Sequence, residues 1–248
     1  MSTVITRDRG AVRHVILNRP DKRNAMNGEL VEALGAALLR AAHDSEVRCV
    51  VIRGEGKVFS AGMDLAQLAA LADHADALHE FRAACMVGWS ACEEMRKPTI
   101  AQIHGACIGG ALELALACDL RVVAADARLG LVETSVGLIP DLGGCSRLPA
   151  IVGVGRAKDL IMTSRLIDGT EAERIGLANR VTDAEQLDSV CEALVEQLLA
   201  CSPAAVGLAK RVIDAAAKPA LVATLELEGT AQEVCVRAAM ATAGAAVN

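Results

Sequence analysis

The segment Thr99–Leu120 (TIAQIHGACIGGALELALACDL) constrains the fold of this 248-residue chain more than any other stretch. It opens with the β-branched run Thr99–Ile103, which predicts a short buried strand, and Gly105 then indicates a tight turn. After Gly109-Gly110 the alanines and leucines favour a helix. Glu113 lies in the middle of this apolar helix, so its presence there needs a physical explanation.

Glu113 has two interpretations. The first N–H groups of a helix have no intrahelical partner and carry the positive end of the dipole, so the Gly110 amide is predicted to donate to an anionic oxygen. Glu113 follows three residues later on the same face, and its side chain leans back toward the N-terminus. It is then either a capping or ion-paired core acid, or a desolvated general acid or base beside an oxyanion donor.

A second stretch, Phe59–Leu65 (FSAGMDL), follows a predicted strand and leads into a helix expected from Asp64 to about Ala72. Asp64 can cap that helix, and Gly62 allows a turn that leaves the Met63 amide pointing outward. Such a turn alone is typical of many capped helices. Together with Gly110, however, it supplies the second of two convergent N–H groups, which is what an oxyanion hole requires.

A third stretch, Leu131–Gly144 (LVETSVGLIPDLGG), places Glu133 and Asp141 eight residues apart in a loop rich in glycine and proline. Catalytic groups often lie on loops that a rigid scaffold positions. The Pro140-Asp141 pair can equally be an ordinary turn, with Asp141 capping a helix that begins at Leu142. Both interpretations of Asp141 stay open at this level.

The remaining pattern alternates strands with helices and predicts an α/β chain. Further strands are expected at 12–17, 48–52, 120–124 and 128–132, and further helices at 29–42, 73–96, 187–200, 203–217 and 221–240, with a helix and a short strand between 169 and 181. The last helix carries an apolar stripe at helical spacing, which fits either an intramolecular core or a subunit interface: Leu227, Ala231, Val234 and Ala238.

Composition excludes several classes of function. A net charge of −6, with no tyrosine, two phenylalanines and one tryptophan, argues against nucleic-acid binding. Apolar runs stop short of the ~20 residues of a membrane span, and the N-terminus lacks a signal-peptide core. The nine cysteines show no metal-ligand spacing and indicate buried thiols in a reducing cytoplasm, so the expected localisation is cytoplasmic.

Other chemistries are also disfavoured by pattern. No GxGxxG, GxSxG or GxxxxGK[ST] motif occurs, which argues against dinucleotide, serine-hydrolase and P-loop sites. Four acids provide enough charge for Mg²⁺, but one of them serves better as a helix cap and nothing else supplies ligands, so no metal is expected. These four are Asp64, Glu113, Glu133 and Asp141.

The stretches FSAGMDL, HGACIGGALELALACDL and VETSVGLIPDLGG together resemble the three signature regions of the enoyl-CoA hydratase/isomerase (crotonase) superfamily, in the same order and at fitting separations. The resemblance covers nearly the whole chain, including the NRPDKRNAMN loop at 18–27. It implies an α/β fold with a crotonase-like spiral of ββα units and the CoA and catalytic site over residues 1–185. Residues 186–248 are then a helical trimerisation region of a homotrimer or homohexamer.

The same resemblance implies a site for an acyl-CoA thioester, with no further cofactor. Glu113 and Glu133 match the two catalytic glutamates of the hydratase branch, and the amides of Met63 and Gly110 match its oxyanion hole. A cationic turn in an acidic chain also suits the nucleotide phosphates of coenzyme A. The residues expected to bind substrate are Lys22, Arg23, Ala25, Ala61, Gly62, Met63, Asp64, Leu65, Gly109 and Gly110.

Asp141 departs from the simplest hydratase pattern, because hydratases often have a small residue there whereas dienoyl-CoA and some ring-opening isomerases have an aspartate. A third acid can move a proton between distant carbons, which is isomerisation by Glu133 and Asp141 without water. Dienoyl isomerases, however, carry aspartate where Glu113 stands, and single-acid enoyl isomerases lack its equivalent. Hydration is therefore favoured, since two glutamates directly provide a water-activating pair. A non-catalytic acyl-CoA-binding protein is the third alternative, and retention of both glutamates argues against it.

Overall fold

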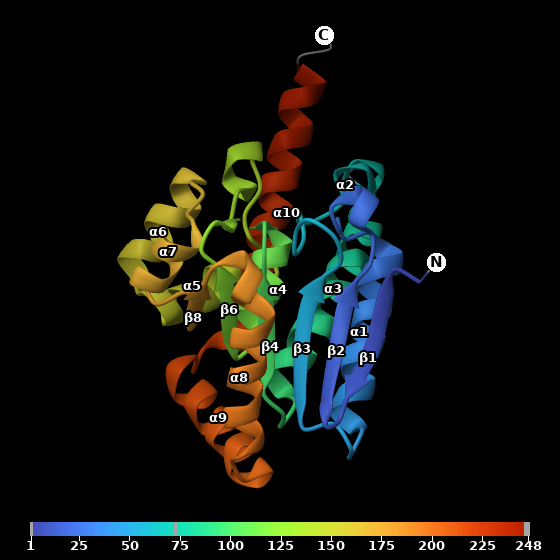
Figure 1. The fold of residues 1–248 in the computed structure, drawn as a ribbon. Helices are drawn as coiled ribbons and strands as arrows, with labels where there is room; N and C mark the ends of the chain where they lie inside the picture. Colours follow the sequence, from blue (N-terminus) through green and yellow to red (C-terminus); the bar gives the residue numbers. More distant parts are fainter. Residues whose placement is uncertain (1, 72–73, 246–248) are drawn as a thin grey trace.

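The computed structural model describes residues 2–71 and 74–245, and its centre is a six-stranded sheet in the order β1-β2-β3-β4-β6-β8 (Figure 1). Only β1 and β2 pair antiparallel, and every other neighbouring pair is parallel. The strands are β1 (Val4–Arg9), β2 (Val12–Leu17), β3 (Cys49–Gly54), β4 (Thr99–Ile103), β6 (Leu120–Ala124) and β8 (Arg180–Thr182).

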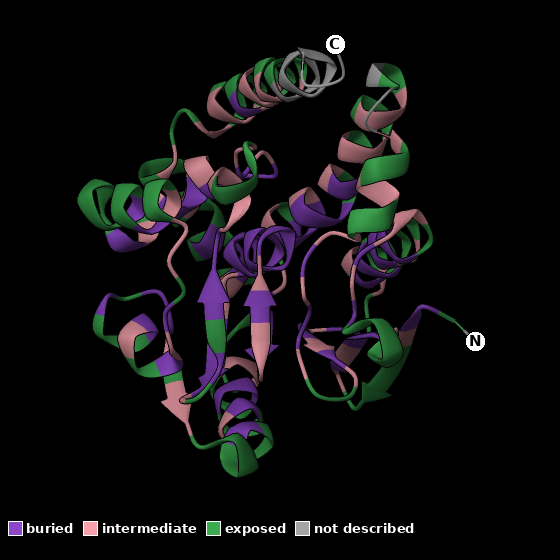
Figure 2. Ribbon diagram, turned by 90° about the horizontal axis from the view of Figure 1, so that it is seen from above, coloured by how far each residue is buried: buried purple, intermediate pink, exposed green. Residues whose placement is uncertain are grey.

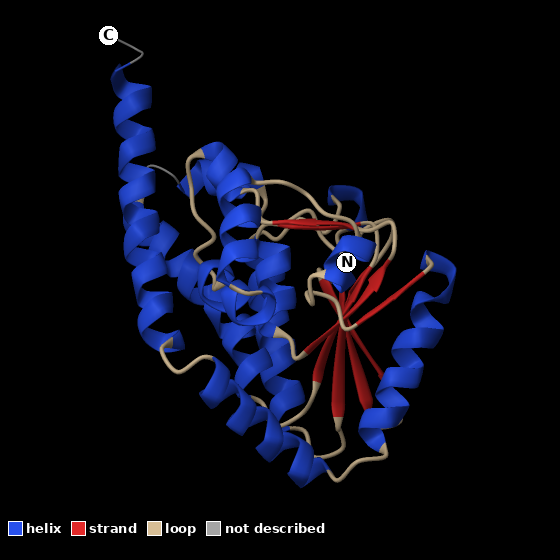
Figure 3. Cartoon of the chain, turned by 90° about the vertical axis from the view of Figure 1, so that its left-hand side faces the viewer, coloured by secondary structure: helices blue, strands red, loops and turns tan. Residues whose placement is uncertain are grey.

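Helices cover both faces of this sheet. The parallel strands read as continuous apolar runs because both of their faces are buried. Helices α1 (Gly28–His43) and α3 (Ala75–Glu94) lie on one face, and α8 (Leu187–Leu199) lies on the other (Figures 1 and 3). The predicted strands at 12–17, 99–103 and 120–124 are confirmed at those bounds. The helices expected at 29–42, 187–200 and 203–217 are also confirmed to within a residue or two.

Strand β1 and helix α6 (Val154–Thr163) have no counterpart among the sequence predictions. Strand β1 forms the edge of the sheet, and its last four residues, Thr6–Arg9, are exposed or nearly so. Charged residues are common on edge strands, where they discourage pairing with other chains. Because its second half is polar and charged, β1 lacks the alternating apolar pattern that predicts a strand.

A second, smaller layer lies across the end of the main sheet (Figure 3). Strands β5 (Ala106–Ile108) and β7 (Arg128–Gly130) pair parallel, and single bridges join Ser60 to Cys107 and Met26 to Met63. Each of these segments follows a strand of the main sheet, so the loops pair side by side in the same order as the strands that lead into them. The chain thus repeats one strand–strand–helix unit.

This arrangement gathers the three motif stretches at one edge. Strands β3, β4 and β6 are parallel and lie next to one another in the sheet, so their carboxyl ends share that edge. The stretch 59–65 follows β3, 105–113 follows β4 and 131–144 follows β6. Sites of open parallel sheets form beyond the carboxyl ends of the strands, which is where these stretches meet.

Helix α4 (Gly110–Ala117) continues from β5 into the centre of the molecule, where all of its residues are buried, as the purple colouring of Figure 2 shows. A helix that is apolar on every side is stable only when it is surrounded by protein. Helices α2 (Leu65–Leu71), α5 (Gly144–Val152) and α7 (Gly169–Arg174) lie around the sheet, and α4 fills the space beneath the motif loops.

The C-terminal helices contact the core to different extents. Helix α8 places Leu187, Cys191, Leu194 and Val195 in the same apolar core as the sheet. Helix α9 (Pro203–Ala217) is tied to the core by Lys210, whose Nζ lies 2.9 Å from Asp119 Oδ2. The division at residue 185 stays a prediction.

Helix α10 (Leu221–Ala245) runs along the outside of the molecule (Figure 1). Leu227 and Val234 of its apolar stripe are 66% and 61% exposed, so the stripe does not face the core of its own chain. No single helix in the described ranges is long and apolar enough to cross a membrane. The pair Ala184–Leu199 and Pro203–Ala217 meets that test by length and composition, with a bend of 103°. The predicted helix boundary at Ala72 and Asp73 lies outside the described residues.

Candidate active site

The segment around Met63 pairs with Met26 in a way that leaves the Met63 amide free to bind another group. Gly62 O accepts from Met26 N at 2.8 Å, and Asp64 N donates to Met26 O at 3.0 Å. In such a parallel pairing the N–H of the residue between these two groups lies on the opposite edge. This segment also pairs with residues 106–108 on its other side, where Ser60 N donates to Ala106 O at 3.0 Å and Ser60 O accepts from Ile108 N at 3.3 Å. The Met63 N–H has no acceptor among the described residues.

The second amide belongs to Gly110, at the start of α4. Gly109 precedes the helix with φ 56° and ψ −130°, a conformation that glycine adopts readily, and its own N–H donates to Gly130 O at 2.8 Å. The Gly110 N–H has no acceptor in the described part of the chain. A Cβ at Gly62 would lie 3.8 Å from Gly109 Cα, so the backbones that lead into Met63 and Gly110 run side by side, and the Met63 side chain packs against Gly110. The two unpaired amides therefore belong to neighbouring backbone segments.

Glu113 is 2% exposed and bonds to backbone amides rather than to a cation. Its Oε1 accepts from Leu142 N at 2.8 Å and from Gly144 N at 2.9 Å. Burial raises the pKa of Glu113 well above its ordinary value, and the charges of Glu133, Asp141 and a further acid add to that effect. Within the described ranges Glu113 forms no ion pair, so the ion-paired interpretation does not match its contacts, and it does not cap its own helix but accepts amides at the start of α5.

Glu133 begins the 3₁₀ helix η2 (Glu133–Val136) and approaches Gly109, where a Cβ would lie 2.9 Å from Glu133 Oε1. Its Oε2 is buried and has no hydrogen-bond partner among the described residues. Burial raises the pKa of Glu133 to about 7, and the charge of Asp141 contributes. A buried polar atom without a partner costs folding free energy, so this oxygen calls for a functional explanation.

Asp141 lies beside Arg82 of α3. The Arg82 Nε is 3.3 Å from Asp141 Oδ2 and also donates to the Asp141 carbonyl at 3.1 Å. Burial raises the pKa of Asp141 to about 6, although Arg82 opposes the rise. The alternative in which Asp141 caps a helix from Leu142 is wrong: α5 begins at Gly144 and has no side-chain cap. The amides of that turn donate instead to carboxylates from segments that are distant in the sequence.

Glu228 of α10 is a site residue that the sequence prediction missed. It is 4% exposed, its Oε2 accepts from Gly143 N at 2.7 Å and its Oε1 accepts from Ser146 Oγ at 2.6 Å. Burial raises the pKa of Glu228 as well. No local signal separates Glu228 from the exposed Glu226 two residues earlier, because its burial depends on a loop that lies far away in the sequence.

The predicted CoA-binding turn lies next to the oxyanion amides. Lys22 and Arg23 are exposed, and Arg23 and Asn24 adopt left-handed conformations with φ 52° and 53°. The Asn24 side chain holds the turn in place by donating to Glu55 O at 2.8 Å and to Val58 O at 2.9 Å. Ala61 N donates to Arg23 O at 2.9 Å, so the cationic turn is bonded directly to the segment that carries Met63.

Two of the predicted substrate-binding residues differ from the others in their surroundings. Asp64 Oδ1 accepts from Ala66 N at 3.1 Å, which confirms its capping function, and Oδ2 pairs with Arg19 at 2.9 Å. The carboxylate of Asp64 is thus already bonded. Leu65 is 77% exposed, whereas Ala25 and Met63 are partly buried and Gly62 is buried.

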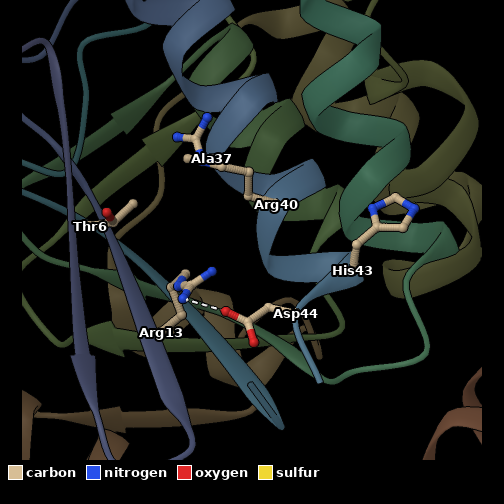
Figure 4. A pocket seen from close by; sticks show the side chains of 6 residues that line it. All are labelled: Thr6, Arg13, Ala37, Arg40, His43 and Asp44. Carbon is tan, nitrogen blue, oxygen red and sulfur yellow. Dashed lines mark hydrogen bonds and ion pairs between the residues drawn. The ribbon is translucent and has the colours of Figure 1, made fainter. Parts of the chain in front are cut away.

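The motif residues line neither of two pockets found elsewhere on the molecule. One pocket, of about 470 Å³, lies between β1, β2 and α1 (Figure 4), and its Arg13 is paired with Asp44 at 2.9 Å and with Asp8 at 2.7 Å. The other, of about 220 Å³, lies under α8 and includes His14 and Gln102. In the described residues no group of three or more His, Cys, Asp or Glu is arranged to hold a metal ion.

Comparison with known proteins identifies the family. The model of the family described as "Enoyl-CoA hydratase/isomerase" matches residues 7–245. The chain is 34% identical over 226 residues to a probable enoyl-CoA hydratase of Rhizobium meliloti, covering 91% of this chain and 86% of that protein. It is also 34% identical over 218 residues to a short-chain-enoyl-CoA hydratase of Clostridium acetobutylicum, covering 86% and 82%.

Solved structures agree with this result. A Thermobifida fusca protein in complex with acetoacetyl-CoA has 36% identity and a TM-score of 0.80, with 94% of each chain covered. The chain therefore belongs to the enoyl-CoA hydratase/isomerase family, and the predicted crotonase-like α/β fold is confirmed.

Proposed function

We propose that the protein is an enoyl-CoA hydratase, which adds water across the 2,3 double bond of a 2-enoyl-CoA thioester. One observation carries this proposal: the buried carboxyls of Glu113 and Glu133, both with raised pKa, lie beside the unpaired amides of Met63 and Gly110. A thioester oxygen, a water molecule and two proton-transfer groups are the components that hydration requires.

The two amides stabilise the charge that develops during the reaction. The thioester oxygen accepts from Met63 N–H and Gly110 N–H, and both bonds strengthen as the oxygen becomes an enolate oxygen. The pairing with Met26 and the start of α4 fix these amides before substrate arrives. Donors that are fixed in advance do not have to reorganise during the reaction, and removing one typically lowers the rate about 10²–10³-fold.

The two carboxyls divide the proton transfers. Backbone amides hold Glu113 Oε1 and oppose the effect of burial, which raises the pKa of Glu113; in its ionised form Glu113 takes a proton from water as the hydroxyl bonds to the β-carbon. Glu133, whose pKa is about 7, gives its proton to the α-carbon. The pair thus gains one proton and loses one, and a proton transfer from Glu113 to Glu133 restores the starting state.

Isomerisation by Glu133 and Asp141 is the second candidate. The observation in its favour is the pKa of about 6 for Asp141, which lets this group accept and donate protons near neutral pH. Arg82, at 3.3 Å, stabilises the charged form of Asp141 and makes it a weaker proton shuttle. A non-catalytic acyl-CoA-binding function, the third candidate, gives no reason for the unpartnered Glu133 Oε2.

Product analysis in H₂¹⁸O tests the proposal, with 2-enoyl-, 3-enoyl- and 3,5-dienoyl-CoA as substrates. We expect ¹⁸O on the β-carbon, kcat reduced by about 10²–10⁴ in Glu113→Gln and in Glu133→Gln, and little change in Asp141→Asn. Product without label, together with an inactive Asp141→Asn and an active Glu113→Gln, would establish isomerisation in place of hydration.

The proposed partner is an acyl-CoA thioester, and the proposed location is the cytoplasm. Family membership supports the first, and so does the relative solved with acetoacetyl-CoA. The CoA part of the substrate would lie along the segment from Ala61 to Leu65, with its phosphates near Lys22 and Arg23. The chemistry described above needs no additional cofactor.

We also propose that the protein is a homotrimer or homohexamer. Helices α9 and α10 each expose several large apolar side chains, and exposed apolar surface on a helix commonly marks an interface. Light scattering at micromolar concentration should give a mass three or six times that of the 25.7 kDa chain, and a stable monomer would contradict the assignment. The exposed side chains are Leu208, Val212, Ile213, Val222, Leu227 and Val234.

A further inference from the structure

Three consecutive backbone amides at the start of α5 all donate to buried carboxylates. Leu142 N and Gly144 N donate to Glu113 Oε1, at 2.8 and 2.9 Å, and Gly143 N between them donates to Glu228 Oε2 at 2.7 Å. Successive amides in a turn form a concave site that binds anions. Here two acids of the chain itself share that site, and one of them is the proposed water-activating base.

Helix α10 holds this loop at two points. Gln232 Oε1 accepts from Ile139 N at 2.9 Å, and Glu228, one helical turn earlier, bonds to Gly143. On the same face the Leu225 carbonyl accepts from Arg82 at 2.8 Å, and Arg82 pairs with Asp141. The inward face of α10 is therefore polar and contacts the loop on both sides of Asp141.

We infer that Glu228 is a positioning residue for the proposed hydration, because its carboxylate fixes the 142–144 backbone in the orientation that directs the two flanking amides at Glu113. The inference rests on the proposed function for its kinetic consequence. Its geometric content is independent of the reaction, since it concerns only which carboxylate holds which amide.

Glu228 acts on Glu113 in two ways that can be separated. Its hydrogen bonds position the loop, and its negative charge raises the pKa of Glu113 and of Asp141. The other charged groups that face this cluster are Glu133 and Asp141 from the same loop, Arg82 from α3 and Arg147 from α5. The pKa of Glu133 is raised by burial and by the charge of Asp141.

Two variants separate the effects. Glu228→Gln keeps an oxygen that accepts from Gly143 N–H and places its NH₂ group where the Ser146 hydroxyl can accept, so it removes the charge and preserves the geometry. Glu228→Ala removes both. Glu226→Gln is the matched control, because Glu226 lies on the exposed face of the same helix and its side chain forms no hydrogen bond or ion pair among the described residues.

Kinetics over pH 5–9 with a 2-enoyl-CoA, and hydrogen exchange of the segment 141–147, provide the measurements. In Glu228→Gln we expect the limbs of the kcat/KM profile, which report the interacting Glu113 and Glu133 carboxyls, to move about one pH unit lower because the negative charge of Glu228 is lost. In Glu228→Ala we expect kcat to fall about 100-fold with faster exchange at Gly143. Glu226→Gln should match the wild type in both measurements.

Unshifted limbs in Glu228→Gln, or exchange at Gly143 in Glu228→Ala equal to that of Glu226→Gln, would overturn the inference. A uniform loss of kcat at every pH in Glu228→Gln would also overturn it, because that is the result of a purely structural defect. If Glu228→Ala does not fold, the hydrogen exchange of segment 141–147 and the pH profile of kcat/KM in Glu228→Gln test the inference. A wild-type protein that hydrates no 2-enoyl-CoA would refute the proposed function, and hydrogen exchange would still test the positioning by Glu228.

Discussion

Glu93 and Glu133 are both largely buried, and their surroundings give them opposite properties. Glu93, on α3, lies between Arg147 and Lys218, each with a nitrogen 2.6 Å from one of its oxygens. Burial alone would raise the pKa of Glu93, but these two cations lower it below its ordinary value. Glu133 pairs with no such cation in the described part of the chain, and burial raises its pKa to about 7.

The comparison shows that burial does not identify a functional acid by itself. Glu93 has both oxygens bonded to cations, so its charge is satisfied by the fold, and it joins α3 to α5 and to the residue that follows α9. Glu133 keeps one buried oxygen without a partner in the described part of the protein. An acid that the fold leaves unsatisfied is the one available to a substrate, at a cost in stability.

Glu93→Gln should produce the largest effect on stability. It leaves the fully buried Arg147 guanidinium without its counter-ion, and breaking a buried pair in this way typically costs about 3–5 kcal/mol. Urea unfolding followed by circular dichroism, at one fixed protein concentration, measures the loss. Glu94→Gln, at the adjacent exposed position, should stay within about 0.5 kcal/mol of wild type. Equal midpoints for the two variants would remove the distinction between Glu93 and Glu133.

Glu133→Gln should raise the free energy of unfolding, whereas Glu93→Gln lowers it, and the size of this effect should depend on pH. The pKa of Glu133 is about 7 in the folded state and near 4.5 when unfolded, so the folded state binds more protons between these values and wild-type stability falls as pH rises through them. The variant avoids this loss. We expect its unfolding free energy, relative to wild type, to rise by up to about 3 kcal/mol between pH 4 and pH 8.

Glu29→Gln serves as the control for that pH dependence, because it makes the same change of side chain at an exposed position. A constant difference between Glu133→Gln and wild type across the range would show that Glu133 is as well satisfied as Glu93. The stability contributed by Glu93 has the reverse dependence, since its lowered pKa makes that contribution disappear on acidification.

Lys22→Glu/Arg23→Glu should produce the smallest effect, because both side chains are exposed and exposed charges interact weakly. We expect the Kd for a CoA thioester to rise about tenfold at low salt and the difference to shrink at high salt. Arg7→Glu/Arg40→Glu changes the net charge equally at exposed positions on β1 and α1 and should leave Kd nearly unchanged. A Kd in the first variant equal to that in the second would remove this turn from the site.

Local sequence determined the elements that carry the candidate site. The β-branched run Thr99–Ile103 forms β4 and the Gly109-Gly110 pair opens α4 at the predicted positions, because propensity, apolar pattern and turn chemistry agree within a few residues. The same agreement produced the Asp64 cap. Loops after adjacent parallel strands then meet, so Glu113, Glu133 and Asp141 converge at one edge of the sheet.

Tertiary structure decided which hydrogen-bond and ion-pair partners each acidic side chain has. The sequence offered Asp141 as the cap of a helix from Leu142, but those amides bond to Glu113 and Glu228, which reach them from α4 and α10. Nothing local distinguishes Glu93 from Glu94, or Glu228 from Glu226. A short-range pattern reports the conformation of the backbone, whereas the pKa and the availability of a carboxyl depend on partners that only the folded chain brings within a few ångströms.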